Sequence, residues 1–226
     1  MLRKLTVVMA ALLLPAIILA QTEKPDLPKI EKEIADKNSP FYYPALLKRY
    51  TDNDTTLSNE QYRYLYYGFS FQKNYSAYGS PSVDEELKKA ISANETDKVI
   101  ELEKKALAEF PFNIRNLYML RKMLDKKGET ALADVYDKKM ISVVKAIMST
   151  GDGATDTTAM YVISVQHEYD IISLLGYKPT GQALIRSKYG EVDKMNLAKN
   201  DDGTENLYFN VKILFESMTN LFKKKD

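Results

Sequence analysis

Residues 58–68 of this chain of 226 residues read Ser58-Asn-Glu-Gln-Tyr-Arg-Tyr-Leu-Tyr-Tyr-Gly68. Ser58 and Gln61 match a capping box, in which each side chain accepts a hydrogen bond from the backbone N–H of the other residue. The box predicts a helix that runs to about Gln72. The tyrosines also alternate, which would suit a strand, but the cap and the length favour the helix. Gly68 destabilises this helix by about 1 kcal/mol relative to Ala, which is tolerable where another element packs closely.

The predicted helix carries aromatic side chains on two faces. The first face holds Tyr62, Tyr66 and Phe69, and the second holds Tyr64, Tyr67 and Phe71. One face must pack into the core, and burial of both faces is favoured. The alternative is that the second face binds a peptide or a carbohydrate, because a tyrosine offers a flat apolar ring and a polar tip. Tyr64, Tyr67 and Phe71 are therefore the candidate binding residues.

Helical spacing of apolar residues continues on both sides of this stretch. Upstream, it predicts short helices over residues 27–37 and 41–50. Downstream, it predicts four helices joined by tight turns, over residues 83–92, 95–109, 113–127 and 129–148. Ser82 and Glu85 match a second capping box at the start of the first of these four helices, and Gly128 closes the third.

The pattern changes after residue 148. Residues 149–158 consist mainly of Ser, Thr, Gly and Asp, and this composition predicts a flexible linker. The remainder predicts a strand over 161–166, a short helix over 170–175, a β-hairpin of 193–199 and 204–211, and an amphipathic helix from 211 onward. The predicted fold is therefore α+β, with N-terminal helical hairpins packed on a small C-terminal antiparallel sheet that ends in a helix.

The helices over residues 83–148 resemble tetratricopeptide-type hairpins. Ala106 precedes Pro111 by five residues, as in the closing helix of that repeat. The Trp of the repeat is missing, and Arg121 stands where the repeat has Gly. At most about one and a half repeats fit, whereas a solenoid needs about three. We therefore expect these TPR-like hairpins to pack against the rest of the chain.

The first twenty residues have the layout of a secretory signal peptide. Arg3 and Lys4 precede the apolar run Leu5–Ala20, and polar residues follow at once, which predicts cleavage after Ala20. An uncleaved anchor is the alternative, but the run is shorter than the roughly 20 residues that a spanning helix needs. No Cys follows the cleavage point, so a lipoprotein is not expected. The protein is expected to be exported to the periplasm or beyond, with no membrane span after cleavage.

The expected organisation follows from these segments. Residues 1–20 form the signal peptide, residues 21–150 the helical region, and residues 151–226 an α+β region that joins the helical region in one compact domain. About 200 residues are enough to bury a good core.

Composition excludes several kinds of site. The chain has 32 Lys and Arg, 31 Asp and Glu, one His and no Cys. Without cysteine there can be no disulfide, no Cys-ligated metal centre and no thiol nucleophile. The balanced charge argues against nucleic-acid binding, which needs a basic surface. We therefore expect no cofactor, no metal site and no nucleic-acid partner.

The densest polar cluster of the chain is His167-Glu-Tyr-Asp170. His167 could act as a general base near neutral pH, and the carboxylates could assist it or hold a metal ion. A metallopeptidase motif would need a second His at position 171, where this chain has Ile. The alternative is a structural histidine, bonded to a backbone carbonyl or a carboxylate. His167, Glu168 and Asp170 are the candidate catalytic residues.

Four short stretches together resemble a known family. They are Ser39-Pro-Phe-Tyr-Tyr-Pro44, Tyr62-Arg-Tyr-Leu-Tyr-Tyr-Gly68, His167-Glu-Tyr-Asp170 and Leu207-Tyr-Phe209. This combination is similar to an uncharacterised family of exported bacterial proteins, the domain-of-unknown-function family four-nine-one-nine. The resemblance implies a bacterial exported protein and supplies no catalytic residues.

Three functions are compatible with these observations. The first is a non-enzymatic binding or assembly module of the cell envelope, whose partner is an envelope protein, a peptide or a glycan. The second is a hydrolase or metal-dependent enzyme centred on His167, Glu168 and Asp170. The third is a structural envelope protein that pairs with a partner through the edge strand of its sheet. The sequence does not decide whether the protein is an enzyme, but the lack of a recognised catalytic constellation favours the first function.

Overall fold

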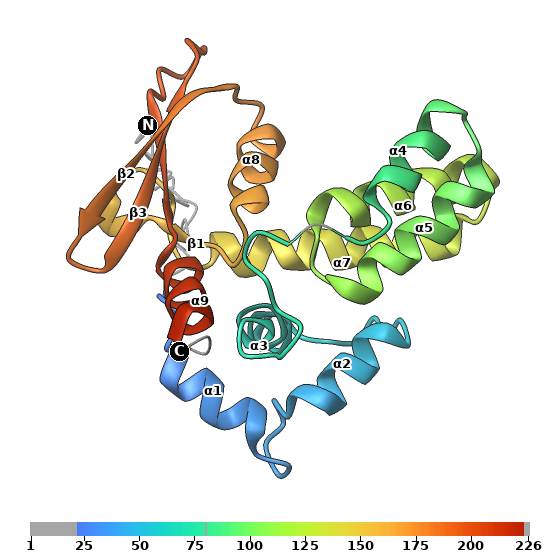
Figure 1. Ribbon diagram of the computed structural model, residues 1–226, viewed down its shortest axis with the longest axis horizontal. Helices are drawn as coiled ribbons and strands as arrows, with labels where there is room; N and C mark the ends of the chain where they lie inside the picture. Colours follow the sequence, from blue (N-terminus) through green and yellow to red (C-terminus); the bar gives the residue numbers. More distant parts are fainter. Residues whose placement is uncertain (1–21, 80, 224–226) are drawn as a thin grey trace, which may run out of the picture.

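The computed structural model describes residues 22–79 and 81–223, so the predicted signal peptide lies outside the described residues (Figure 1). The helices are α1 Leu27–Ala35, α2 Tyr43–Thr51, α3 Asn59–Phe69, α4 Asp84–Ser92, α5 Thr96–Glu109, α6 Ile114–Lys127, α7 Thr130–Met148, α8 Val165–Leu174 and α9 Lys212–Lys223, with a 3-10 turn at Asp156–Thr158. The strands are β1 Met160–Tyr161, β2 Pro179–Ser187, β3 Gly190–Leu197 and β4 Asn206–Asn210. This is the α+β fold that the sequence predicts.

The helices follow their sequence signals closely. Both bonds of the Ser58–Gln61 capping box are present, each 3.1 Å long, and α3 begins at the next residue after Ser58. Gly128 ends α6 with a φ of 83°, a conformation that glycine adopts without strain. The four helices predicted over residues 83–148 are α4 to α7, and each packs against the next. Their likeness to tetratricopeptide hairpins stays a prediction.

The second predicted capping box is wrong. Ser82 does not cap α4; its backbone N–H donates to the Glu109 carboxylate at 2.8 Å, and its hydroxyl donates to the same group. A carboxylate is a stronger acceptor than a neutral partner, and it accepts both bonds at once. Ser82 therefore ties the loop before α4 to the end of α5.

The sheet has the strand order β1-β4-β3-β2 within the described residues. The β3–β4 hairpin is confirmed, and Gly203 in its turn has a φ of 75°. The expectation of a purely antiparallel sheet is wrong, because β1 pairs with β4 in parallel. Strand β2 was not predicted, since its sequence contains Pro and Gly and lacks a clear alternation.

Residues 149–166 differ from the sequence-based expectation. The predicted linker is a packed turn, in which the Gly153 N–H donates to the Thr158 carbonyl and the Tyr208 N–H donates to the Gly153 carbonyl, both at 2.9 Å. The predicted strand is shortened to β1, because the Ser164 hydroxyl accepts a bond from the Gln166 N–H and starts α8. The N-cap bond of Ser164 thus ends the strand earlier than the apolar alternation over residues 161–166 predicts.

Helix α3 lies at the centre of the main core, between α1 and α2 on one side and α7 on the other (Figure 1). Its aromatic side chains are buried on both faces, as favoured from the sequence. A Cβ at Gly68 would lie 3.1 Å from the Tyr43 ring, so a close approach of α2 accounts for this glycine. The main cluster of buried apolar side chains draws on α1–α3, α6–α9 and the sheet, whereas the buried apolar residues of α4 and α5 lie mainly in two smaller clusters.

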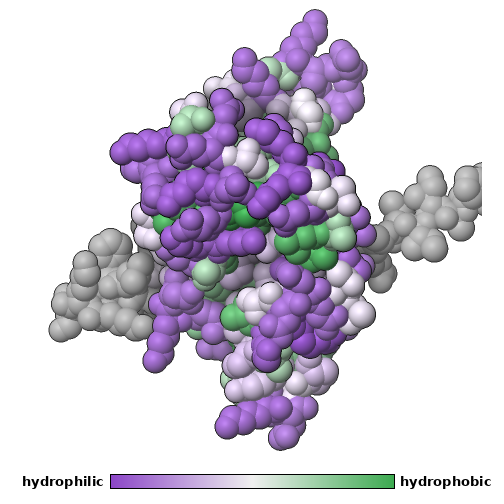
Figure 2. Space-filling model, turned by 90° about the vertical axis from the view of Figure 1, so that its right-hand side faces the viewer, coloured by the Kyte–Doolittle hydropathy of each residue, from purple (hydrophilic) through white to green (hydrophobic). Residues whose placement is uncertain are grey.

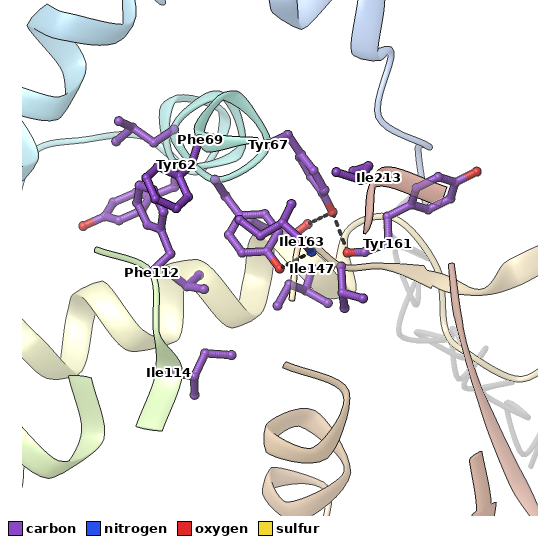
Figure 3. Packing of buried hydrophobic residues seen from close by; sticks show 14 of the residues in the cluster. Tyr62, Tyr67, Phe69, Phe112, Ile114, Ile147, Tyr161, Ile163 and Ile213 are labelled. Carbon is purple, nitrogen blue, oxygen red and sulfur yellow. Dashed lines mark hydrogen bonds between the residues drawn. The ribbon is translucent and has the colours of Figure 1, made fainter. Parts of the chain in front are cut away.

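Three buried tyrosines of the core direct their hydroxyls at backbone carbonyls. Tyr67 from α3 points toward Tyr161, whose carbonyl accepts its hydroxyl bond at 3.0 Å (Figure 3). The Tyr75 hydroxyl donates to the Ile163 carbonyl at 2.7 Å, and the Tyr50 hydroxyl donates to the Pro111 carbonyl at 2.6 Å. These bonds satisfy polar groups that water cannot reach.

The surface differs from this core. The side of the molecule that carries α4–α6 is mainly hydrophilic, with small apolar areas between charged side chains (Figure 2). Within residues 22–79 and 81–223, no helix combines the length and the hydropathy that crossing a bilayer requires.

The packed turn can be tested with a glycine substitution. A Cβ at Gly151 would lie 2.1 Å from the Thr158 carbonyl oxygen, a backbone atom that cannot move alone. We expect Gly151→Ala to lower the free energy of unfolding by more than about 2 kcal/mol, measured by urea denaturation. The control is Gly203→Ala, where no atom lies within 4 Å and the φ of 75° alone costs about 1 kcal/mol. Equal losses of unfolding free energy in the two variants would mean that residues 149–158 adapt to the added Cβ as a flexible linker does.

Candidate functional site

Helix α8 places the His167 side chain in the core. Its Nδ1 lies 2.7 Å from the Tyr66 hydroxyl, and its Nε2 lies 3.1 Å from the Phe112 carbonyl oxygen. A carbonyl can only accept, so the Nε2 carries the proton and the Nδ1 accepts from Tyr66. The Tyr66 hydroxyl in turn accepts a bond from the Ile163 N–H at 3.2 Å. Burial lowers the pKa of His167 to about 3, so the ring is neutral.

We call this hydrogen-bonded chain, from the Phe112 carbonyl through His167 and Tyr66 to the Ile163 N–H, the His167 relay. It begins and ends at a backbone group. It connects the loop before α6, through Phe112, with the segment before α8, through Ile163. His167 has no exposed surface, and both of its ring nitrogens are engaged. The arrangement holds two loops together and leaves no ring nitrogen free for a substrate.

Glu168 points instead toward β3, where it meets Asp193. Burial, with a smaller contribution from Asp193, raises the pKa of Glu168 to about 9, so this carboxyl is protonated at neutral pH. No donor of the described residues bonds its oxygens. The nearby Asp193 carboxylate accepts a bond from the Gln182 amide at 2.5 Å, and burial raises the pKa of Asp193. Tyr78 lies nearby at the surface, and burial and the two acids raise its pKa.

Asp170 points in a third direction, toward α6. Its Oδ1 accepts from the Gln166 amide at 3.0 Å and from Arg115 at 3.4 Å. Burial raises the pKa of Asp170, whereas these two partners lower it. The candidate catalytic residues His167, Glu168 and Asp170 thus face the core, the sheet and α6, and they do not converge on one site.

The candidate binding residues are also separated. Tyr67 has no exposed surface, and Tyr64, only 5% exposed, stacks on Phe41 with a ring-centre distance of 3.8 Å. Phe71 lies beyond the end of α3 and is 37% exposed. They form no common platform, but Tyr64 lines a cavity between α1, α3 and α7.

Two adjoining cavities follow α7, and we call them together the α7 groove. The first has a volume of about 640 Å³ and is lined by residues of the N-terminal segment, α1, α3 and the end of α7. The second has a volume of about 580 Å³ and lies between the start of α3 and the middle of α7, from Asp134 to Lys145. Asn59 and Lys145 line both cavities, so the two adjoin at these residues.

The groove is long enough for an extended chain. Asp134 lines one end of it and Met148 the other. Between them α7 advances by roughly 21 Å, at about 1.5 Å per residue. An extended peptide of about six residues spans that length.

The lining of the groove combines apolar and charged groups. Ile141 and Met148 expose large apolar side chains there. Several charged side chains of the groove have no ion-pair partner among the described residues, among them the cations Lys29 and Lys145 and the anions Glu60 and Asp134. A ligand that fits this groove therefore offers charges of both signs and some apolar surface.

Arg63 supports one wall of the groove. Its guanidinium donates to the Ser149 hydroxyl at 2.6 Å and to the Glu23 carbonyl. The Glu23 N–H donates to the Ser149 carbonyl at 2.9 Å. The N-terminal segment is thereby joined to the end of α7. Sequence reasoning missed this groove because no local motif links α1, α3 and α7.

No group of three or more His, Asp or Glu side chains is arranged to hold a metal ion in the part of the chain that the structure describes. A family model for a domain of unknown function, DUF4919, matches residues 28–219. No curated protein and no solved structure matches the chain.

The His167 relay makes a prediction about stability. Tyr66→Phe removes the hydroxyl that bonds both the Ile163 N–H and His167, and it leaves two buried polar groups without partners. We expect the free energy of unfolding to fall by about 2–4 kcal/mol in urea denaturation. The control is Tyr169→Phe, whose half-exposed hydroxyl bonds Gln182 and whose loss should cost less than about 1 kcal/mol. Similar losses in both variants would contradict a structural relay.

The acid pair predicts a pH-dependent effect. Folded Glu168 stays protonated up to about pH 9, whereas its ordinary pKa is 4.5, so wild-type stability falls as the pH rises between these values. Gln cannot ionise. From pH 5 to pH 8, Glu168→Gln should therefore gain about 1–4 kcal/mol in unfolding free energy relative to the wild type, measured in urea. The control is Glu205→Gln at an exposed position. The same pH dependence in both variants would rule out a buried proton on Glu168.

Proposed function

We propose that this chain, which belongs to the DUF4919 family, is an exported bacterial binding module of the cell envelope that holds a short extended peptide in the α7 groove. The observation that carries this proposal is the groove itself. It is open and elongated, and unpaired charges of both signs lie beside apolar side chains. Export is part of the proposal and depends on the signal peptide predicted over residues 1–20.

A peptide fits the groove better than a glycan does. Each of the two cavities has the volume of an ordinary ligand site, and together they form a channel rather than a single pocket. A peptide supplies ammonium and carboxylate groups for Glu60 and Lys145, and side chains for Ile141 and Met148. A neutral sugar would leave these charges unpaired and would gain little from the apolar residues.

The enzyme alternative receives less support from the geometry. A general base must reach the proton that it removes, within about 3 Å or through one water molecule. His167 and Glu168 are fully buried, and both ring nitrogens of His167 are bonded within the core. These contacts favour a binding role without chemistry at this cluster.

Retention of peptides from a tryptic digest of bacterial envelope proteins tests the proposal. We expect the immobilised chain to retain a defined set of short peptides, identified by mass spectrometry. Lys145→Glu should reduce their retention at least fivefold, because it reverses a charge at the point where both cavities meet. The matched control is Lys104→Glu, an exposed position on α5 that does not line the groove, which should retain the same peptides as the wild type.

Two outcomes would overturn the proposal. One is equal peptide retention by the wild type and by Lys145→Glu, with both proteins shown to fold by circular dichroism. The other is retention of oligosaccharides without any peptide.

A further inference from the structure

Strand β2 forms one edge of the sheet, and among residues 22–79 and 81–223 it pairs only with β3 (Figure 1). The β2–β3 hairpin lies on the side of the molecule opposite α4–α6, and residues 180–184 are exposed. An edge strand presents a row of backbone N–H and C=O groups that have no partner strand. The long outer edge of β2 can therefore accept one further strand.

The side chains of this edge do not prevent pairing in its middle. Residues 180–185 read Thr-Gly-Gln-Ala-Leu-Ile and carry no charge. Leu184 is 53% exposed, although a protected edge usually carries a charge at such a position. The only register irregularity between β2 and β3 lies between Pro179 and Gly181, at the start of the strand. The centre of β2 thus lacks the charges, prolines and bulges that commonly block edges.

The charges of the edge lie at its two ends and have one sign. Lys178 precedes β2, and Arg186 and Lys188 stand at its end, all of them exposed. Residues 178–188 contain no Asp or Glu. Arg186 pairs with the partly buried Glu191 of β3 at 3.2 Å, and the Arg186 side chain itself remains exposed to solvent. The edge is therefore basic at both ends and neutral in the middle.

We infer that β2 docks an extended segment of a partner protein, one that is uncharged in the middle and acidic at its ends. Backbone bonds to the edge supply general affinity, and the flanking charges select the partner. On one side of the sheet, partner side chains would lie beside Leu184 and Gln182. Gln182 is held in place there by bonds with Asp193 and Tyr169.

A second copy of this chain is the less suitable occupant. Pairing of two β2 strands would bring the basic ends of both copies into one interface. Like charges across paired strands are destabilising. Acidic flanks on a different protein would instead neutralise Lys178, Arg186 and Lys188. Charge complementarity therefore favours a separate acidic partner over self-association.

Fluorescence anisotropy with three labelled synthetic peptides tests this inference. The first two peptides have the core Thr-Val-Thr-Val-Thr. The first has two Glu at each end, the second has two Lys at each end, and the third keeps the Glu ends but has both Val replaced by Pro. The acidic peptide should bind at least tenfold more tightly than the other two, and its affinity should fall with added salt. Proline removes backbone donors, so the third peptide separates strand pairing from simple charge attraction.

Two triple variants locate the binding site. Lys178→Glu, Arg186→Glu and Lys188→Glu, combined in one protein, should weaken binding of the acidic peptide at least tenfold. The control protein combines Lys104→Glu, Lys122→Glu and Lys126→Glu, which lie on exposed positions of α5 and α6 and should leave binding unchanged.

Several results would overturn the inference. They are no binding of the acidic peptide, equal binding of the acidic and proline peptides, and equal binding by both triple variants. A dimer of the wild type in light scattering that the β2 variant abolishes would also overturn it, in favour of self-pairing. Because β2 and the α7 groove share no residues, Lys145→Glu should not change this binding.

Discussion

A buried tyrosine hydroxyl needs a hydrogen-bonding partner, and this requirement determines how the chain is arranged around α3. Tyr66 and Tyr67 have no exposed surface, and water cannot satisfy their hydroxyls. The partners come from residues 161–163, about a hundred positions later in the chain. Helix α3, which comes early in the chain, therefore depends on the later segment between β1 and α8 to satisfy its buried hydroxyls. The fold is specific because these bonds admit few alternative positions.

Local signals in the sequence predicted the elements that local chemistry controls. The Ser58 capping box, the closing Gly128 and the turn at Gly203 all occur in the structure. The failures lie where distant groups compete. Ser82 donates to the carboxylate of Glu109, which is 27 positions away in the chain, and therefore does not cap α4. Strand β2 forms through its pairing with β3, whereas its own residue composition does not predict a strand.

The candidate catalytic cluster shows why neighbours in sequence are not necessarily neighbours in a site. Successive residues of a helix point about 100° apart, so His167, Glu168 and Asp170 reach three different surroundings. A strand over the same residues would have placed His167 opposite Glu168 but on the same face as Tyr169. The α7 groove shows the converse, because residues more than a hundred positions apart in the sequence line it together. Only the tertiary structure could bring those residues together.

The bond between Glu23 and Ser149 has a further meaning for ligand binding. One wall of the groove is a segment attached to α7 by one backbone bond and by the guanidinium of Arg63. Each such bond contributes only about 1 kcal/mol, so this wall is held less firmly than the packed helices. A ligand that touches both α1 and α7 would add its own binding energy to this attachment. By thermodynamic linkage, the attached wall and the ligand then stabilise each other to the same extent.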